Sequence, residues 1–147
     1  MNVKNLMNRN PETISPSTSL KTAAALMAEK NIGFLLVGAD NELKGTLTDR
    51  DIVQRAVAKG KNMDQTTVQD ALTGTVLYCN ADEDINEVAR NMSEQKVRRL
   101  PVVDNNKRLV GIVSIGDMAQ HIDQDKVGKV LQGVTSDDQR AAWDRAW

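Results

Sequence analysis

The apolar positions of this 147-residue chain fall into two matching blocks about 65 residues apart. Residues 20–27 carry apolar side chains at i, i+3, i+4 and i+7, the spacing of a helix with one buried face, and residues 85–92 repeat it. Ser19 and Asp84 precede these segments and can cap a helix. A short apolar run, a polar turn and a second strand follow each helix. The pattern therefore predicts two units of order β-α-β-β-α.

The last strand of each block leads into a polar motif that also occurs twice. Each copy has a glycine, a hydroxyl residue and an aspartate at three-residue intervals: Gly45, Thr48 and Asp51, then Gly111, Ser114 and Asp117. The glycines can adopt positive φ or allow a ligand to approach the backbone. The hydroxyls and N–H groups of a helix start suit an anionic group, and an aspartate suits the vicinal hydroxyls of a ribose. Alternatively, the hydroxyl residues cap the following helices and the aspartates add favourable charge there. The recurrence of both polar residues favours a ligand contact.

Composition and charge narrow the classes of function. The chain has 19 basic and 20 acidic residues, so no global field favours nucleic acid or an acidic membrane surface. No apolar run approaches 18 residues, and the first residues lack the apolar stretch of a secretory signal. Cys79 is the single cysteine and His121 the single histidine, which leaves no disulfide, catalytic triad or convergent metal ligands. We therefore expect a cytoplasmic protein without catalytic or metal-binding residues.

The doubled motif, together with the apolar run over residues 97–104, resembles the cystathionine-β-synthase-type (CBS) domain. Two such domains in tandem resemble a Bateman module, and the match spans about residues 3–122. The resemblance implies an α/β (α+β) fold in which two β-α-β-β-α repeats pack through their sheets as a pseudo-twofold pair. We accordingly expect CBS repeat 1 over residues 1–62, CBS repeat 2 over residues 63–123 and a C-terminal helical tail over residues 124–147.

The resemblance also implies two clefts between the repeats that bind adenosine-containing ligands such as AMP, ADP, ATP, NAD or S-adenosylmethionine. In the family the motif aspartate holds the ribose, which makes Asp51 and Asp117 the first candidates, with Thr48 and Ser114 beside them. A family cleft combines the aspartate turn of one repeat with strands of the other. The remaining candidates are therefore strand residues: Leu77, Tyr78, Val97, Arg98 and Arg99 for the first cleft, and Thr13, Ile14, Ile32 and Gly33 for the second.

The two predicted sites differ in charge. Arg98 and Arg99 in the second copy replace a Gly-Phe pair in the first, and alternation along a strand directs one of the two arginines toward a given cleft. Arg50 precedes Asp51, whereas a glycine precedes Asp117. Arginines beside Asp51 favour a phosphorylated ligand. The alternative is that Arg50 pairs with the aspartate before it and that the other arginines are solvated. We expect a stronger nucleotide site at Asp51 and a weaker or empty one at Asp117.

The tail lies outside the repeats and contains two tryptophans. Trp143 and Trp147 are four residues apart, hence on one face of a helix that Ser136 can cap. This segment can pack back on the repeats or bury against a second subunit or another partner, where tryptophan is a frequent anchor. Of these, the sequence favours self-association.

Taken with the resemblance, these features predict a sensor of adenine nucleotides rather than an enzyme. We expect a homodimer of CBS pairs that transmits nucleotide binding to an unidentified regulated protein. A ligand can do so only through its differential affinity for two arrangements of the protein. The alternative is a structural module with no ligand, whose function is dimerisation or protein interaction.

Overall fold

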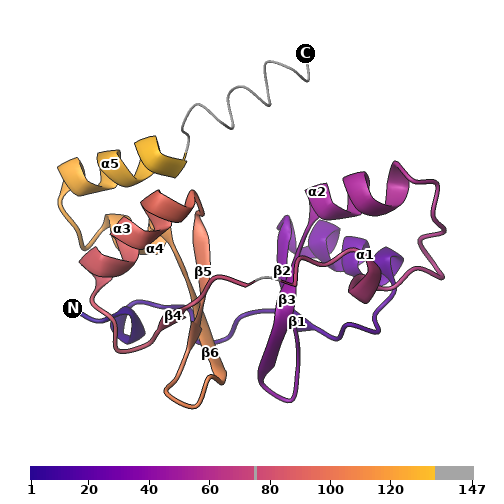
Figure 1. The fold of residues 1–147 in the computed structure, drawn as a ribbon, viewed down its shortest axis with the longest axis horizontal. Coiled ribbons are helices and arrows are strands. Elements are labelled where there is room, and N and C mark those ends of the chain that lie inside the picture. Colours follow the sequence, from indigo (N-terminus) through magenta and orange to yellow (C-terminus); the bar gives the residue numbers. More distant parts are fainter. Residues whose placement is uncertain (75, 135–147) are drawn as a thin grey trace. The chain divides into compact units, whose positions relative to one another are not determined.

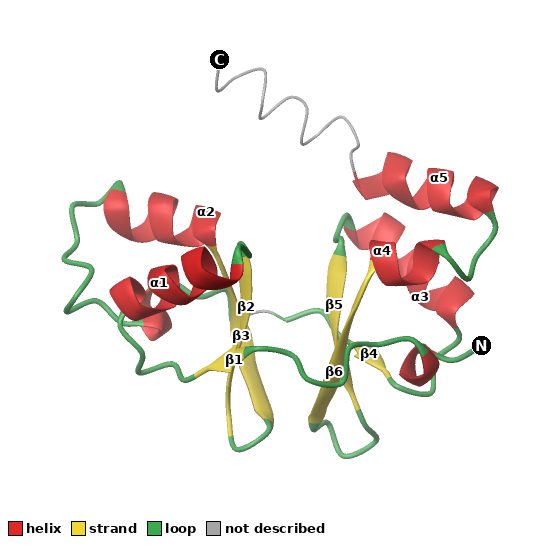
Figure 2. Ribbon diagram, turned by 180° about the vertical axis from the view of Figure 1, so that it is seen from behind, coloured by secondary structure: helices red, strands yellow, loops and turns green. Residues whose placement is uncertain are grey.

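The computed structural model describes residues 1–74 and 76–134, which form two compact units (Figure 1). One unit contains residues 1–10, 78–106 and the chain from residue 110 onward, and the other contains residues 11–77 and 107–109. Each unit has a three-stranded mixed sheet, with strand order β1-β2-β3 in one and β4-β5-β6 in the other. In both units the helices cover one face of the sheet (Figure 2). The α+β class and the two tandem repeats are thus confirmed.

The first repeat has the predicted order of elements. They are β1 (Thr13–Ile14), α1 (Leu20–Lys30), β2 (Phe34–Ala39), β3 (Glu42–Thr48) and α2 (Asp49–Ile52). Strand β1 runs parallel to β2, and β2 runs antiparallel to β3. Helix α2 continues directly into a π-helical stretch (Val53–Val57). The motif turn at Thr48 therefore joins the end of β3 to the start of α2.

The second repeat has the same order and is followed by one more helix. Its elements are β4 (Cys79–Asn80), α3 (Ile85–Gln95), β5 (Arg99–Val103), β6 (Leu109–Ser114) and α4 (Ile115–Ala119). Strand β4 runs parallel to β5. Helix α5 (Gln124–Val134) packs on α3 and forms the first part of the predicted helical tail. The other residues of that tail, including Ser136, Trp143 and Trp147, lie outside the described residues.

The first helix of each repeat begins and ends with the same chemistry. Ser19 Oγ accepts a hydrogen bond from the N–H of Thr22 (3.1 Å), and Asp84 Oδ1 accepts one from the N–H of Asn86 (2.9 Å). Both helices end at a non-glycine residue in the left-handed conformation, Asn31 (φ 52°) and Lys96 (φ 58°). Because this conformation stops a helix and turns the chain, each helix leads directly into the next strand.

Each unit combines one repeat with the segment that leads into the other repeat. Asn8 exchanges two backbone hydrogen bonds with Ile112 (2.9 and 3.0 Å), so the N-terminal segment is attached to β6. At the equivalent position Thr73 exchanges two with Thr46 (2.9 and 3.0 Å), which attaches the segment before β4 to β3. The short 3₁₀-helices Val3–Asn5 and Val68–Asp70 belong to these segments.

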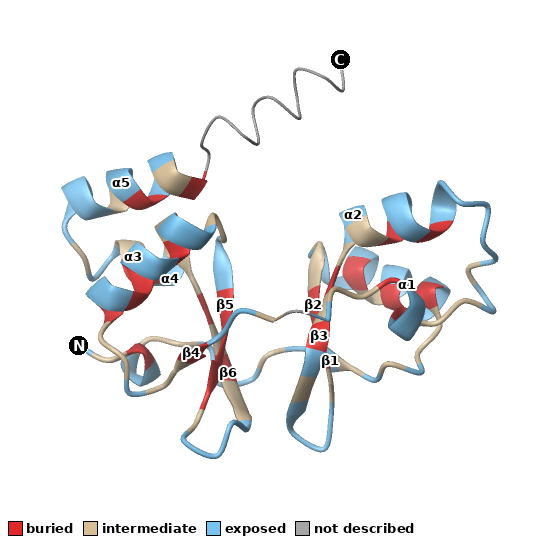
Figure 3. Ribbon diagram, viewed as in Figure 1, coloured by how far each residue is buried: buried red, intermediate tan, exposed pale blue. Residues whose placement is uncertain are grey.

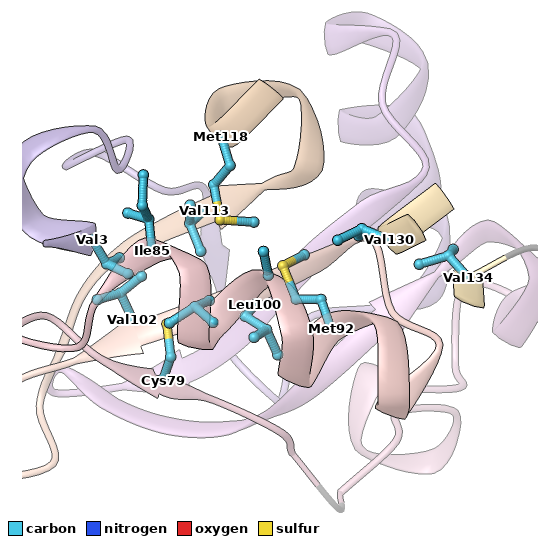
Figure 4. Close-up of a cluster of buried hydrophobic side chains, with 12 residues drawn as sticks. Val3, Cys79, Ile85, Met92, Leu100, Val102, Val113, Met118, Val130 and Val134 are labelled. Carbon is cyan, nitrogen blue, oxygen red and sulfur yellow. The ribbon is translucent and has the colours of Figure 1, made fainter. Parts of the chain in front are cut away.

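Two separate apolar clusters form the cores of the two units. One contains Leu20, Leu35 and Leu47, and the other contains Met92 and Met118 among the side chains drawn in Figure 4. Buried residues recur along the helices and the strands of both units (Figure 3). Every fully buried side chain in the described part of the chain is apolar or a cysteine. None of the described helices is long and apolar enough to cross a membrane.

Candidate functional site

The motif turn of the first repeat is a capping box. The N–H of Asp51 donates to Thr48 Oγ1 (3.1 Å), and the N–H of Thr48 donates to Asp51 Oδ2 (3.0 Å). The two residues thereby satisfy N–H groups that the first turn of α2 leaves without helical partners. The structure therefore confirms the alternative interpretation of this motif, in which its hydroxyl residue and aspartate cap the following helix.

The second repeat builds the same turn with a serine. The N–H of Asp117 donates to Ser114 Oγ (3.1 Å), and the N–H of Ser114 donates to Asp117 Oδ2 (2.9 Å). In both repeats the box engages one carboxylate oxygen and leaves Oδ1 outside it. A carboxylate oriented in this way still has acceptor capacity for a hydroxyl donor. The capping role and a ligand contact are thus compatible.

A backbone hydrogen bond connects each turn to the residues ahead of the adjacent strand. The N–H of Asp49 donates to the carbonyl of Gly33 (3.0 Å), and the N–H of Ile115 donates to the carbonyl of Arg98 (3.0 Å). Gly33 and Arg98 occupy equivalent positions in the two repeats and were both predicted to contact adenine. The structure therefore places a predicted strand residue beside the aspartate turn of its own repeat.

The predicted site residues divide between the two units. Eight lie in the unit of the first repeat: Thr13, Ile14, Ile32, Gly33, Thr48, Arg50, Asp51 and Leu77. The other six lie in the other unit: Tyr78, Val97, Arg98, Arg99, Ser114 and Asp117. The predicted cleft, in which the aspartate turn of one repeat and the strands of the other contact the same ligand, stays a prediction.

The glycines of the motif have a packing role that the sequence interpretation missed. Neither has positive φ; among the described glycines only Gly60 does. A Cβ at Gly45 would lie 2.6 Å from the carbonyl oxygen of Thr73, and one at Gly111 would lie 2.8 Å from that of Asn8. These positions lack a side chain because the segment leading into the other repeat crosses the strand there. We expected these glycines to provide positive φ or room for a ligand. The structure instead explains them by a close contact with the backbone of another segment.

Arg55 is the cation nearest to Asp51, and sequence reasoning did not identify it. Its Nη2 lies 3.9 Å from Asp51 Oδ1, and its Nη1 is within hydrogen-bond distance of the carbonyl oxygens of Ala71 (3.0 Å) and Leu72 (2.9 Å). The i, i+4 spacing of Asp51 and Arg55 on one helix was the available signal. Arg55 thus connects the motif helix to the segment that crosses β3.

The predicted arginines are exposed. Arg50 donates its backbone N–H to Asp49 Oδ1 (2.8 Å), and within the described residues no ion pair involves its guanidinium. Arg98 and Arg99 are exposed as well. Within each unit taken by itself, the three arginines are therefore solvated, as the alternative interpretation of the sequence held.

Three of the predicted adenine-contacting residues are apolar and exposed. Ile32 is 37% exposed, Leu77 is 41% exposed and Tyr78 is 51% exposed. Two hollows lie close to the turns. One of about 470 Å³ is lined in part by Ile32 and Gly33, and one of about 270 Å³ is lined in part by Asp117 and His121. Exposed Ile32 and Asp49 of the first turn line the same hollow, and a hollow with both apolar and polar walls is suited to a ligand with an apolar ring and a polar sugar.

The single cysteine and histidine have different surroundings. Cys79 is buried on β4, where burial and, to a smaller extent, the charge of Glu83 raise the pKa of its thiol to about 12. Cys79 is therefore a small buried strand residue. His121 is exposed. Among residues 1–74 and 76–134 no group of three or more His, Cys, Asp or Glu side chains is arranged to hold a metal ion.

Comparisons with known proteins agree on one family. The family model described as the CBS domain matches residues 3–58 and 68–124. YhcV, a CBS domain-containing protein of Bacillus subtilis, is 35% identical over 134 residues, which cover 90% of this chain and 94% of YhcV. Hypoxic response protein 1 of Mycobacterium tuberculosis is 34% identical over 134 residues, which cover 90% of this chain and 93% of that protein.

Solved structures extend the likeness to the fold. Hypoxic Response Protein I, crystallised with two coordinated zinc ions, superposes with a TM-score of 0.75 at 36% identity, covering 83% of this chain and 99% of that chain. The CBS domain pair of protein MJ0100, in complex with 5'-methylthioadenosine and S-adenosyl-L-methionine, superposes with a TM-score of 0.69 at 30% identity, covering 82% of this chain and 98% of that chain. This chain therefore belongs to the CBS domain family and carries two CBS domains in tandem.

Proposed function

We propose that this protein is a regulatory module that binds an adenosine-containing ligand at its two aspartate turns. The observation that carries the proposal is the geometry of the turns. In each turn the capping box fixes the aspartate and leaves one carboxylate oxygen outside the box. A carboxylate oriented in advance needs little reorganisation to accept a ribose hydroxyl. MJ0100, a CBS pair 30% identical to this chain, is bound to two adenosine-containing ligands.

The exposed apolar residues supply the second half of the proposed contact. Ile32, Leu77 and Tyr78 have exposed apolar surface that an adenine ring could contact. The strand residues Thr13, Ile14, Gly33 and Val97, together with Arg50, Arg98 and Arg99, remain proposed contacts. AMP, ADP, ATP, NAD and S-adenosylmethionine are the candidate ligands. Arg50, which lies in the first turn, favours those that carry phosphate.

In this proposal the protein transmits binding instead of catalysing a reaction. A ligand shifts the population of two conformations only as far as its affinities for them differ. The proposed receivers of this change are a second copy of the chain, in a homodimer, and a regulated cytoplasmic protein. The competing proposal is a structural module with no ligand, for which the buried apolar cores and the capping boxes would be sufficient.

Calorimetric titration of single-residue variants tests the proposal. Asp51→Asn and Asp117→Asn keep an amide oxygen for the box and remove the negative charge. Because hydrogen bonds to charged groups contribute about 1.5–3 kcal/mol, each variant should weaken one binding event by about 10- to 100-fold. Asp70→Asn is a matched control, because Asp70 forms a third capping box with Thr67 outside the motif.

Two results would contradict the proposal. Titrations without saturable heat for any of the five candidate ligands and 5'-methylthioadenosine would support the structural module. Equal losses in the Asp70→Asn control would show that the effect comes from helix capping and not from a ligand contact. If Asp117→Asn removes the tighter binding event, the ranking of the two sites is reversed.

A further inference from the structure

Arg55 joins the first aspartate turn to a segment that lies outside it. On one side of its guanidinium, Nη2 is 3.9 Å from Asp51 Oδ1. On the other side, Nη1 donates to the carbonyl oxygens of Ala71 (3.0 Å) and Leu72 (2.9 Å), which belong to the crossing segment, residues 71–73. Because the guanidinium is a rigid plane, a displacement of one nitrogen also moves the other. One side chain thus connects the motif aspartate with the crossing segment.

The distance between Asp51 and Arg55 bears on the proposed ligand contact. At 3.9 Å the ion pair is too long for a direct hydrogen bond, which takes about 2.7–3.2 Å for an N–H donor. A hydroxyl group is both donor and acceptor, so it can donate to Asp51 Oδ1 and accept from Arg55 Nη2 at the same time. A water molecule can make the same two bonds, but a hydroxyl of a bound ligand is held in place by the rest of the ligand. A ribose hydroxyl at Oδ1 would therefore also fix the guanidinium.

The crossing segment depends on Arg55 for two of its hydrogen bonds. Its three N–H groups donate to the carbonyls of Val68 (3.0 and 2.9 Å) and Thr46 (2.9 Å). Among the described residues, Arg55 is the only donor to the carbonyl oxygens of Ala71 and Leu72. Ala71 is 1% exposed, and a buried carbonyl without a donor destabilises the conformation that buries it. The contact with Arg55 therefore favours the closed, hydrogen-bonded form of the segment.

The second repeat has a histidine in place of this arginine. His121 follows Asp117 by four residues, as Arg55 follows the aspartate of the first turn. Residues 6–8 are the equivalent of the crossing segment, because they make the same backbone hydrogen bonds and attach to β6. His121 and Asp117 line one hollow of about 270 Å³, yet within the described chain no hydrogen bond or ion pair joins the imidazole to Asp117 or to residues 6–8. The link between turn and segment is thus a property of the first repeat.

We propose that Arg55 couples ligand binding at Asp51 to the crossing segment. A ligand hydroxyl between Asp51 Oδ1 and Arg55 Nη2 fixes the guanidinium and so strengthens its hold on the two carbonyls. Bound ligand thereby favours the closed form of the segment, which precedes the second repeat in the chain. Arg55 is a positioning residue in this coupling. The inference rests on the proposed function, because it requires a ligand hydroxyl at Asp51.

Hydrogen exchange of the crossing segment, with and without bound ligand, tests the coupling. The probes are the six compounds of the calorimetric titration, beginning with 5'-methylthioadenosine, which has ribose hydroxyls and no phosphate. With this probe, an effect of Arg55 cannot come from attraction of a phosphate. The three amides are hydrogen-bonded, so their exchange measures opening of the segment. At a saturating concentration we expect exchange to slow by about 2- to 10-fold, the factor that one added hydrogen bond supplies.

Arg55→Gln should abolish this ligand-induced protection, because it removes the guanidinium fork. It should also weaken the binding event by a similar factor, since coupling between two sites is reciprocal. The rates with and without ligand are compared within each variant, so that a general loss of stability cancels. Lys59→Gln is the matched control, because it removes an exposed positive charge just after the same helical stretch and should keep both effects. Residues 6–8 are the internal reference, whose exchange should not depend on Arg55.

The outcomes separate this coupling from the proposed function. Saturable binding that leaves the exchange of the crossing segment unchanged, or that protects it equally in Arg55→Gln, would overturn the coupling alone. Equal protection of residues 6–8 and of the crossing segment would show general stabilisation by the ligand and would overturn it as well. Complete loss of binding in Arg55→Gln would make Arg55 a ligand contact without a coupling role. Titrations without saturable heat for any compound would overturn the proposed function and this inference with it.

Discussion

Replacing Gly45 by alanine tests the packing role that the structure gives to the motif glycine. The new Cβ would lie 2.6 Å from the carbonyl oxygen of Thr73 and 3.0 Å from Cδ1 of Leu72. The leucine methyl can rotate away, but the carbonyl belongs to the backbone. Thr73 is held on Thr46 by two hydrogen bonds (2.9 and 3.0 Å), so the carbonyl can retreat only by stretching them.

The expected cost follows from these contacts. Overpacking a well-packed site costs about 1–3 kcal/mol, and each backbone hydrogen bond that is lost adds about 0.5–1.5 kcal/mol. We therefore expect Gly45→Ala to lower the free energy of unfolding by about 2–4 kcal/mol. Domains of this size are stable by only about 5–15 kcal/mol, so the change should be easily measured.

Urea denaturation followed by far-UV circular dichroism measures this change, because the signal reports on the backbone of the helices and strands. The midpoint should fall while the slope with denaturant stays the same. The matched control is Gly128→Ala in α5, where an added Cβ meets no atom within 4 Å. It should raise stability by about 0.5–1 kcal/mol because alanine favours a helix. A Gly45→Ala variant as stable as the wild type would refute the close-contact explanation.

Three further predictions concern other described residues. Because the pKa of the Cys79 thiol is raised to about 12, the native protein should react with a thiol reagent at pH 8 much more slowly than the unfolded chain. The same shift favours the folded state at neutral pH, and this contribution should be lost as pH rises from the ordinary thiol pKa toward 12. Arg55→Ala should speed hydrogen exchange in residues 71–73 relative to Arg50→Ala; equal exchange would contradict the bridge to that segment. Ser19→Ala should destabilise the protein by about 1 kcal/mol in thermal unfolding, and an unchanged midpoint would show that the cap contributes nothing.

The order of elements in each repeat could be predicted because its signals are local. Helical spacing of apolar residues and the capping residues Ser19 and Asp84 depend on neighbours within a few positions. The structure confirms the helices after both caps and the strands on either side.

The roles of Gly45 and Arg55 could not be predicted, because both depend on a segment distant in sequence. Thr73 crosses β3 at Gly45, and the carbonyls that Arg55 contacts belong to the same segment. The sequence does not show that the chain leading into one repeat attaches to the sheet of the other. From the sequence alone, the motif glycines are therefore explained by positive φ or by the approach of a ligand.

The four predicted turn residues have a structural role in the turns, whereas their contact with a ligand stays a prediction. Thr48 and Asp51 cap α2, as Ser114 and Asp117 cap α4. Hydroxyl and aspartate three residues apart suit both a capping box and a ribose contact, so spacing alone does not separate the two roles. The unequal strength of the two sites stays a prediction.

The most direct test of the central claim is an amide NMR titration of the uniformly labelled protein with adenosine-containing ligands. We predict that at least one ligand shifts the amide signals of the Thr48–Asp51 and Ser114–Asp117 turns, which bind through their aspartates. The Thr67–Asp70 turn outside the motif, where the N–H of Thr67 also donates to Asp70 Oδ2 (3.3 Å), should stay unchanged. Spectra that do not change at millimolar ligand, or changes confined to residues outside the two motif turns, would contradict the account.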